Sequence, residues 1–421
     1  MIKNVNGMQA RSEPLAIVGV GGRFAAAPDV STFWCNLRQG RDCFTRGPGP
    51  TSVQGLQAGQ HLATWGLMPD RDDFDAEVVG FPGRPDDVDP QHGILFEALW
   101  SAAEDAGVRL SKVGERTALY AGCARVGQVE RAAFEEVVNR DATFAAGHFS
   151  YFHDLQRESL MLDASCATGL AAVHLAGQSL RLHQCDYALA GAVAIVGPGR
   201  TYEWTPKGIY SSEGVCRPFD RRANGTVPGD GAAAVMLRRL TDAQRDGDPI
   251  YAVIRSTCVD NDGRSKAGFT VPGVPGKIAV VRRALDWAGL DGSGLDYVEA
   301  HGVGIPLNDQ IEATALTEAL GSSGRPLALG SVKASIGHTD TAAGLAALIK
   351  TTLALHHAWL PATPNTADPI EEVTRGGARF GLLPEGRPWP VADGPRRAGV
   401  MSAGIGGSNA FAVLEAAPGA G

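Results

Sequence analysis

A cysteine in the first half of the chain occupies a position that suits nucleophilic chemistry. Cys166 lies in the segment SLMLDASCATGLAAVHLAGQSLRL, residues 159–182. The apolar residues before Asp163 predict a strand that ends there, and the small residues after it predict a helix that begins around Cys166. A thiol at a helix N-terminus is typical of a reactive cysteine, because the helix dipole and free N–H groups stabilise a thiolate. A small buried cysteine among alanines is the structural alternative.

Two of the ten histidines lie at similar strand-to-helix junctions. In EAHGVGIPLNDQIE, residues 299–312, a predicted strand ends and His301 follows on a glycine-flanked loop before a helix that carries Asp309 and Glu312. Such junctions are the usual site of chemistry in α/β folds. A lone histidine is more often a surface or core residue, so the argument rests on finding two of them.

The second histidine segment is GSVKASIGHTDTAAG, residues 330–344. A strand is predicted to end before it, which places Lys333 in the following loop and His338 just ahead of another helix of small residues. Neutral imidazoles in such loops can move protons or stabilise an enolate.

A fourth segment, SAGIGGSNAF at residues 402–411, carries glycines at 404, 406 and 407. These glycines allow a tight turn around Ile405 whose backbone amides could face an oxyanion, although a plain β-hairpin turn is the alternative. A thiol nucleophile, two imidazoles and an amide-rich turn together favour acyl-thioester chemistry with carbanion formation.

The elements that position these residues alternate between strands and helices, which favours layered sheets covered by helices. Two α/β halves are expected to meet near residue 250. The predicted elements are a strand at 15–18 leading into a glycine turn at Gly19, Gly21 and Gly22, long loops over about 46–90, a helix over 91–106 and a strand over 117–122. Residues 1–12 are expected to form a flexible arm and residues 417–421 a tail.

Composition excludes several classes of protein. The 421 residues are 44% hydrophobic and 20% charged, as in an ordinary globular chain, and the 54 glycines indicate many turns. The net charge of −8 disfavours binding to nucleic acid or to an anionic membrane. No apolar run suits a membrane span or a signal peptide, and the seven cysteines include no CxxC pair. We therefore expect a cytoplasmic enzyme without a disulfide framework or a metal site.

These segments, taken in order over about residues 13–416, resemble the β-ketoacyl synthases of the thiolase superfamily, of the modular polyketide synthase type. The matching text also includes EPLAIVGVGGRF, DPQHGILFEALWSAAEDAG and GVCRPFDRRANGTVPGDGAAAVML. The resemblance implies an αβαβα sandwich of two similar halves, at residues 13–250 and 251–416. It further implies a homodimer without a bound cofactor, whose substrates arrive on the phosphopantetheine of an acyl carrier protein.

The resemblance also implies a role for each site residue. Cys166 would accept the acyl group, while His301 and His338 would act on the extender carboxylate and the enolate. Lys333 would be a supporting cation, held in turn by Glu312. The backbone N–H groups of Cys166 and Ile405 would form the oxyanion hole.

The sequence departs from the family pattern in the tunnel for the pantetheine arm. The family motif HGTGT reads HGVGI here, so Val303 and Ile305 stand where two threonines line the tunnel, whereas Thr270 matches the third. The nucleophile motif DTACSSS reads DASCATG, and Phe411 replaces the histidine of the late NAH motif. The thiol, both histidines and the lysine are present, so we expect the chemistry to be retained.

The expected function is that of a freestanding, trans-acting ketosynthase that loads an acyl chain onto Cys166 and forms a carbon–carbon bond with a decarboxylating malonyl-type extender. The alternative is an intramolecular aldol or Claisen closure that releases a ring such as a lactone or lactam. A degradative thiolase would be expected to carry a second cysteine near the C-terminus, but the last cysteine is Cys258. A non-catalytic partner protein normally lacks the cysteine, and a transacylase usually lacks one histidine.

Overall fold

The computed structural model describes residues 13–47, 49, 59, 61–81, 88–125, 134–195, 201–375, 379–390 and 394–419. The predicted arm at residues 1–12 lies outside these ranges, and only residues 417–419 of the predicted tail lie within them. Within the described chain, no helix is long and apolar enough to cross a lipid bilayer.

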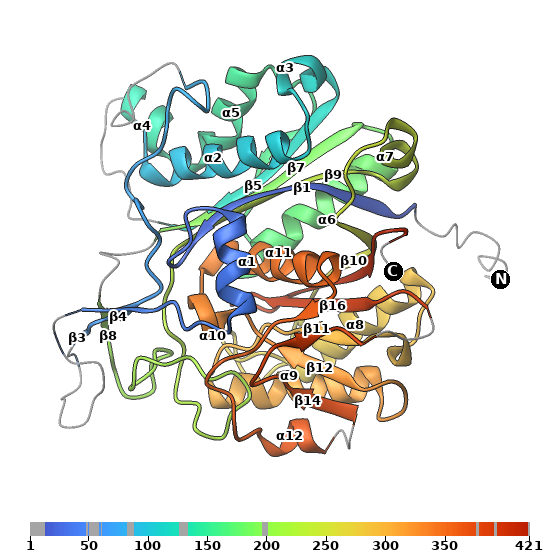
Figure 1. The fold of residues 1–421 in the computed structure, drawn as a ribbon. Coiled ribbons are helices and arrows are strands. Elements are labelled where there is room, and N and C mark those ends of the chain that lie inside the picture. The colour runs from blue at the N-terminus through green and yellow to red at the C-terminus, as the bar shows by residue number, and fades with distance from the viewer. Residues whose placement is uncertain are drawn as a thin grey trace.

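Layers of helices and strands alternate through the molecule (Figure 1). Helix α2 (Pro90–Asp105) packs on the outer face of the upper strands, while α6 (Thr168–Arg181) and α11 (Ala343–His356) lie between the upper and lower strands. Helices α8 (Val274–Ala288) and α9 (Pro306–Leu320) cover the lower strands from outside. The αβαβα arrangement that the resemblance implied is confirmed.

The strands of the N-terminal half follow a defined order across the sheet. In chain order they are β1 (Leu15–Phe24), β5 (Thr117–Cys123), β6 (Ser159–Met161), β7 (Tyr187–Ala194) and β9 (Gly231–Arg239). Their spatial order is β6-β5-β7-β9-β1, in which β5 is parallel to both of its neighbours. Strand β6, which precedes the nucleophile, is therefore an edge strand.

The C-terminal half repeats this topology. Its strands are β10 (Ala252–Asn261), β11 (Tyr297–Glu299), β12 (Leu327–Gly330), β16 (Arg397–Ala403) and β17 (Ser408–Ala416). They lie in the order β12-β11-β16-β17-β10, again third, second, fourth, fifth and first, and β14 (Phe380–Leu382) is added outside β12. Residues 15–17 of β1 pair with 252–254 of β10, which joins the halves into one eleven-stranded sheet.

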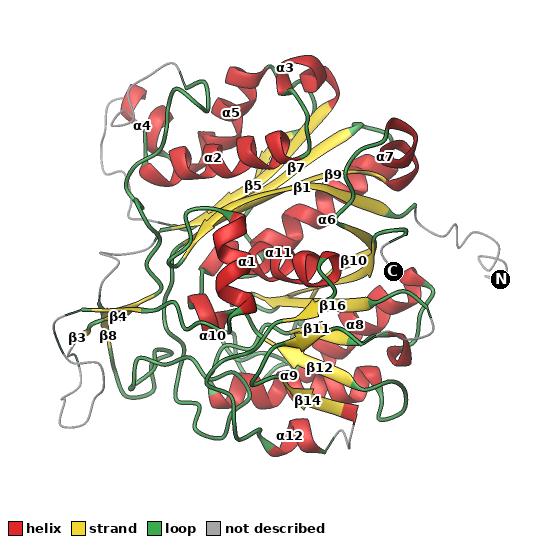
Figure 2. Cartoon of the chain, in the orientation of Figure 1, coloured by secondary structure: helices red, strands yellow, loops and turns green. Residues whose placement is uncertain are grey.

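The other elements are short or peripheral. The helices are α1 (Val30–Arg38), α3 (Leu110–Val113), α4 (Phe134–Arg140), α5 (Ala145–His153), α7 (Leu240–Asp246), α10 (Lys333–Ile336) and α12 (Glu371–Thr374). The strands are β2 (Thr45–Arg46), β3 (His61–Leu62), β4 (Thr64–Trp65), β8 (Tyr202–Glu203), β13 (Trp359–Leu360) and β15 (Arg387–Pro388). Figure 2 shows β3, β4 and β8 standing apart from the main sheet, in agreement with the loops predicted over the described part of 46–90.

The two central helices approach each other closely at their N-terminal ends, where glycines face one another. A Cβ atom at Gly169 of α6 would lie 2.9 Å from the backbone nitrogen of Leu345, and one at Gly344 of α11 would lie 3.0 Å from that of Leu170. Because no larger residue fits this crossing, the small-residue character of both helices is a packing requirement. The crossing brings the turns that precede α6 and α11 together.

The predicted glycine turn after residue 18 is wrong, because β1 continues to Phe24. A Cβ atom at Gly19 would lie 2.0 Å from the carbonyl oxygen of Ala102, and one at Gly21 would lie 2.2 Å from that of Ala98. These glycines therefore let α2 pack directly against the strand. Closely spaced glycines occur both in tight turns and in strands that pack directly against a helix. The sequence does not distinguish these two cases, because the difference lies in the neighbouring helix.

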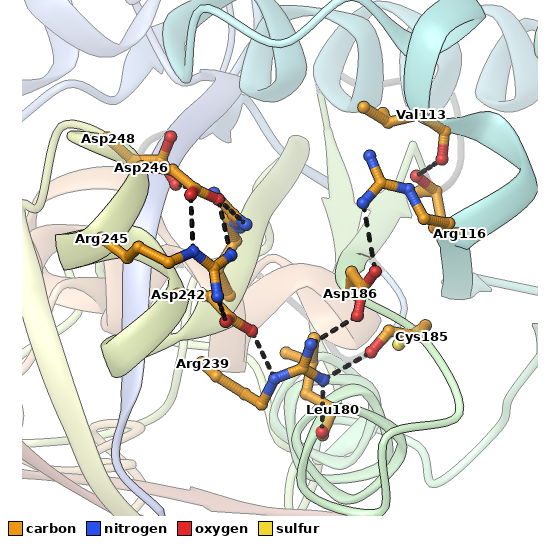
Figure 3. Close-up of polar contacts among 12 residues, drawn as sticks. Val113, Arg116, Leu180, Cys185, Asp186, Arg239, Asp242, Arg245, Asp246 and Asp248 are labelled. Atoms are coloured by element: carbon orange, nitrogen blue, oxygen red, sulfur yellow. Dashed lines mark hydrogen bonds and ion pairs between the residues drawn. The ribbon is translucent and has the colours of Figure 1, made fainter.

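An arginine at the end of β9 braces the C-terminal end of α6 (Figure 3). The Arg239 guanidinium donates to the carbonyl oxygens of Leu180 and Cys185 at 2.8 and 2.7 Å. It also forms ion pairs with Asp186 and Asp242, although its own side chain is only 5% exposed. This network fixes α6 at the end opposite Cys166.

Candidate active site

Cys166 lies in a tight turn between β6 and α6. Ser165 has a φ of +54°, and the hydroxyl of Thr168 accepts the Ala164 N–H at 2.9 Å and donates to the Ser165 carbonyl at 2.6 Å. These bonds close the turn and leave the Cys166 side chain partly exposed. The helix begins at Thr168, two residues later than predicted.

The helix end is expected to stabilise a thiolate, and the burial of the sulfur acts against it. Burial raises the pKa of the Cys166 thiol to about 12, and the neighbouring Asp340 carboxylate adds to that rise. The hydrogen bond with Ser165 and the charge of Lys333 lower the pKa but do not outweigh these effects. The nucleophile is therefore a neutral thiol at pH 7, and acylation requires that its proton be removed.

His301 lies on a loop whose backbone N–H groups are bound by two carboxylates of α9. Glu312 accepts the N–H groups of His301 and Gly302 at 2.7 and 2.8 Å, and Asp309 accepts those of Val303 and Gly304 at 3.0 and 3.1 Å. The loop can turn tightly because Gly302 and Gly304 have positive φ. Both acidic residues that the sequence placed on this helix thus fix the histidine loop.

Lys333 and His338 flank the short helix α10. Lys333 begins this helix, rather than lying in a loop as predicted, and its Nζ donates to the carbonyl oxygen of His301 at 2.5 Å. The backbone of His338 pairs with the segment 227–229, donating to the Val227 carbonyl at 2.8 Å. The two imidazole rings lie 5.6 Å apart and nearly perpendicular.

The interaction between Glu312 and Lys333 differs from the direct contact that the resemblance implied. Both oxygens of Glu312 accept backbone N–H groups, and within the described residues no ion pair joins it to Lys333. Its charge still acts on the lysine, because it raises the Lys333 pKa against the lowering by burial. Glu312 therefore holds Lys333 through the His301 loop.

Backbone donors define the tautomers of both imidazoles. The Ala403 N–H donates to Nδ1 of His301 at 3.3 Å, and the Asp340 N–H donates to Nδ1 of His338 at 3.0 Å. Burial, aided by Lys333, lowers both pKa values, that of His338 to about 3. A neutral ring whose Nδ1 accepts must carry its proton on Nε2, so both histidines present Nε2–H donors.

The turn between β16 and β17 lies against the nucleophile turn. The hydroxyl of Ser402 donates to the carbonyl oxygen of Cys166 at 2.8 Å. A Cβ atom at Gly404 would lie 2.2 Å from the Ala164 carbonyl oxygen, so the two turns are in direct contact. The two predicted oxyanion donors, the backbone N–H groups of Cys166 and Ile405, therefore belong to turns that touch each other.

The three predicted tunnel residues differ in exposure. Val303 is 3% exposed, Ile305 is half-buried at the start of α9, and Thr270 is exposed on the loop after β10. The backbone of Val303 donates to Asp309 and accepts the Cys216 S–H at 3.5 Å. These two bonds fix the Val303 backbone within the histidine loop.

Two residues that contact the nucleophile are absent from the predicted site. Ser402 holds the Cys166 carbonyl, and the Oδ1 of Asp340 lies 3.6 Å from the Cys166 Sγ. Asp340 follows His338 by two residues, and this closeness to a candidate histidine is the signal in the sequence that could have indicated Asp340 as a site residue. Asp340 thus links Cys166 to His338, Ser402 and Ala403 link it to His301, and Lys333 bonds the His301 carbonyl.

Two sequence profiles of one family match most of the chain. "Beta-ketoacyl synthase, N-terminal domain" matches residues 12–243, and "Beta-ketoacyl synthase, C-terminal domain" matches residues 251–367. The chain belongs to the β-ketoacyl synthases. Ketosynthases use no cofactor of their own, and their acyl chains are carried on the phosphopantetheine of acyl carrier proteins.

Similar proteins identify this ketosynthase as one of the polyketide synthase type. It is 38% identical over 442 residues to one polypeptide of the phenolphthiocerol/phthiocerol polyketide synthase of Mycobacterium tuberculosis, an alignment that covers 98% of this chain and 30% of that protein. It is 38% identical over 426 residues to a second polypeptide of the same synthase, with 96% and 28% covered. The chain thus spans less than a third of these relatives.

Solved ketosynthases share the fold over nearly the whole chain. The twelfth ketosynthase of the bacillaene polyketide synthase of Bacillus amyloliquefaciens superposes with a TM-score of 0.89 at 29% identity, covering 96% of this chain and 73% of that one. The ketosynthase from module 1 of the bacillaene synthase of the same species gives 0.87 at 31% identity, with 96% and 76% covered.

Proposed function

We propose that this polyketide ketosynthase takes an acyl chain from an acyl carrier protein onto Cys166 and joins it to a malonyl-type extender with loss of CO₂. One observation carries the proposal: Asp340 connects the nucleophile turn to the two imidazoles, because its Oδ1 lies 3.6 Å from the Cys166 Sγ and its N–H donates to Nδ1 of His338, whose ring lies 5.6 Å from that of His301. In the loading step, Sγ attacks the thioester carbonyl and the bond to the pantetheine sulfur breaks. The thiol proton passes to that departing sulfur.

Condensation then uses the two imidazoles as hydrogen-bond donors. The Nε2–H groups of His301 and His338 donate to the thioester oxygen of the extender, so they stabilise the enolate that forms as CO₂ leaves. The enolate carbon attacks the acyl carbonyl on Cys166. The oxyanion is bound by the backbone N–H groups of Cys166 and Ile405, and its collapse releases the Cys166 sulfur.

Lys333 acts on this step through His301. Its ammonium group holds the His301 carbonyl and, by its charge, favours the neutral form of both rings. A neutral ring donates a hydrogen bond from Nε2 but is too weak an acid to protonate the enolate, which suits an enolate that forms and disappears within one step. We assign Lys333 a positioning role.

An intramolecular ring closure is the second candidate, and the apolar Val303 favours it. A hydroxyl at this position would offer the pantetheine arm a hydrogen bond, whereas Val303 and Ile305 offer none through their side chains. An enzyme that reacts with its tethered chain needs the arm only during loading. The freestanding, trans-acting form stays a prediction for either reaction.

We further propose a homodimer that forms through the free edge of β6. Leu160 on this strand is 48% exposed, and Tyr151 on the adjacent helix α5 is 83% exposed. An edge strand with exposed apolar side chains beside it is prone to pair with another chain. Pairing of two copies through this edge would bury the exposed side chains. Light scattering should give a dimeric mass for the wild type and a monomeric mass for Leu160→Lys.

Intact-protein mass spectrometry tests the function directly. The protein is incubated with a panel of acyl carrier proteins bearing acyl chains, with and without malonyl extender. An elongated chain on the carrier supports condensation, whereas release of product without extender supports ring closure. Cys166→Ala should remove all covalent loading while the protein stays folded, and acylation elsewhere in that variant would contradict the assignment.

A further inference from the structure

A carboxylate from the second half of the chain reaches the nucleophile of the first. Asp340 begins the 3-10 helix Asp340–Ala342, which leads into α11, and its backbone has a φ of +39°. Its Oδ1 accepts the S–H of Cys166 at 3.6 Å, and its side chain is half-buried. Figure 1 shows α6 and α11 side by side between the upper and lower strands, so this contact joins the turns that precede the two central helices.

The histidines are poorly suited to take the thiol proton. Their Nδ1 atoms accept backbone N–H groups from Ala403 and Asp340, so each Nε2 already carries a proton. Lys333 is a donor as well. Among the described residues, the only other hydrogen-bond partner of Sγ is the Ser165 hydroxyl at 3.7 Å, which is not a base at neutral pH. Within that part of the chain, Asp340 is the one basic group in contact with the thiol.

We propose that Asp340 is a catalytic residue of the loading step, the general base that takes the proton from Cys166. The proposal rests on the proposed acyl loading at this cysteine. As Sγ attacks the thioester carbonyl, its proton moves to the Asp340 carboxylate. When the bond to the pantetheine sulfur breaks, Asp340 returns the proton to that sulfur, so the carboxylate is regenerated and no other co-reactant is needed.

The surroundings of Asp340 suit this role. Burial raises the pKa of Asp340 and the nearby Asp163 raises it further, although the bond from Cys166 lowers it. A carboxylate with a raised pKa is a stronger base than one in water. Tyr210 faces the same space, and burial together with the charges of Asp340 and Cys166 raises its pKa, so it stays a neutral phenol. Among the described residues, His338 and Asp340 are joined by the bond from the Asp340 backbone N–H to Nδ1.

The test is to measure two reactions of the same sulfur in Asp340→Asn. Asparagine tolerates positive φ and keeps the backbone N–H that His338 needs. Acylation of Cys166 by a hexanoyl thioester of N-acetylcysteamine should fall by about 100-fold or more. Alkylation by iodoacetamide, which needs only thiolate, should be unchanged or faster, because the variant removes a negative charge beside the sulfur.

The pH dependence gives an independent signature. Wild-type acylation should fall toward acid as Asp340 becomes protonated, whereas acylation of Asp340→Asn should rise steadily with pH as hydroxide generates thiolate. Asp163→Asn is the matched control: Asp163 lies in the nucleophile turn and binds the Ser165 N–H and Arg125. This variant should keep an acidic limb, moved toward lower pH because the charge of Asp163 raises the Asp340 pKa.

Each outcome decides for or against the base. Asp340→Asn that is acylated at the wild-type rate overturns the proposal, and so does a parallel loss of acylation and alkylation. If that variant does not fold, Asp340→Glu replaces it. An acylation rate of Asp340→Glu that still falls toward acid supports the role of Asp340 as the base, and a rate without this fall overturns it. A wild-type protein that is never acylated at Cys166 overturns the proposed function itself, and with it the base.

Discussion

The hydroxyl of Ser402 donates to the carbonyl oxygen of Cys166 at 2.8 Å, although 236 residues separate them along the chain. This bond ties the nucleophile turn of the N-terminal half to the last strand pair of the C-terminal half. The two proposed oxyanion donors, the N–H groups of Cys166 and Ile405, belong to the two turns that this bond joins.

Ser402→Ala should lower the acylation rate of Cys166 by more than its effect on stability suggests. The lost hydrogen bond contributes about 0.5–1.5 kcal/mol to stability, but it also fixes the oxyanion hole, where small displacements are costly. Quenched acylation time courses and denaturant unfolding give the two numbers. Ser256→Ala is the control, since its buried hydroxyl donates to the Ala284 carbonyl at 2.6 Å away from the site. Equal acylation losses in both variants would contradict the role of Ser402.

His301→Asn and His338→Asn should keep loading but stall formation of the carbon–carbon bond. Asparagine retains an acceptor near the position of Nδ1 but has no donor at Nε2, and loss of such a donor typically costs about 10²–10⁴-fold. His→Gln at either position should recover part of the rate. Accumulated acyl-Cys166 is measured by mass spectrometry, and product formation at a near wild-type rate would remove that histidine from the mechanism.

The rate of the condensation step should show no titration of a histidine between pH 5 and 8. Burial lowers the pKa of His301 well below its usual value and that of His338 to about 3, so both rings stay neutral throughout this range. Single-turnover condensation from preloaded acyl-enzyme, measured against pH, checks this expectation. A loss of rate centred near pH 6.5, the ordinary histidine value, would contradict it.

Val303→Thr combined with Ile305→Thr should not improve turnover of the native carrier-bound substrate, and hydrolysis of the loaded chain should increase. The two apolar side chains keep the pocket drier, which protects the enolate and the thioester. Turnover and free acid are measured together by liquid chromatography. A several-fold gain in malonyl-dependent elongation with unchanged hydrolysis would instead indicate an ordinary extending enzyme with a weakened tunnel.

Arg239→Met should destabilise the fold by about 1–3 kcal/mol, because two buried carbonyl oxygens at the end of α6 lose their donor, whereas Asp186 and Asp242 keep Arg116 and Arg245 as partners (Figure 3). Arg245→Met is the matched control. Arg245 also pairs with Asp242, but its side chain is 65% exposed, so little change is expected. Thermal unfolding of the two variants under the same conditions provides the comparison.

Sequence patterns were sufficient to predict the fold class and the places of Cys166, His301 and His338. These features are local: a strand that gives way to small residues or glycine is visible in a few consecutive positions. The resemblance added the family because its motifs recur in order along the chain. Both conclusions depend on residues that are close together along the chain, so they can be drawn without the structure.

The chemical state of the site, in contrast, follows from contacts between distant parts of the chain. The tautomer of His301 depends on the N–H of Ala403, 102 residues away, and the thiol meets Asp340, 174 residues away. Burial, which no sequence pattern measures, turns the predicted thiolate into a thiol and the imidazoles into neutral donors. Protonation follows from distance and desolvation, and both arise only when the two halves pack together.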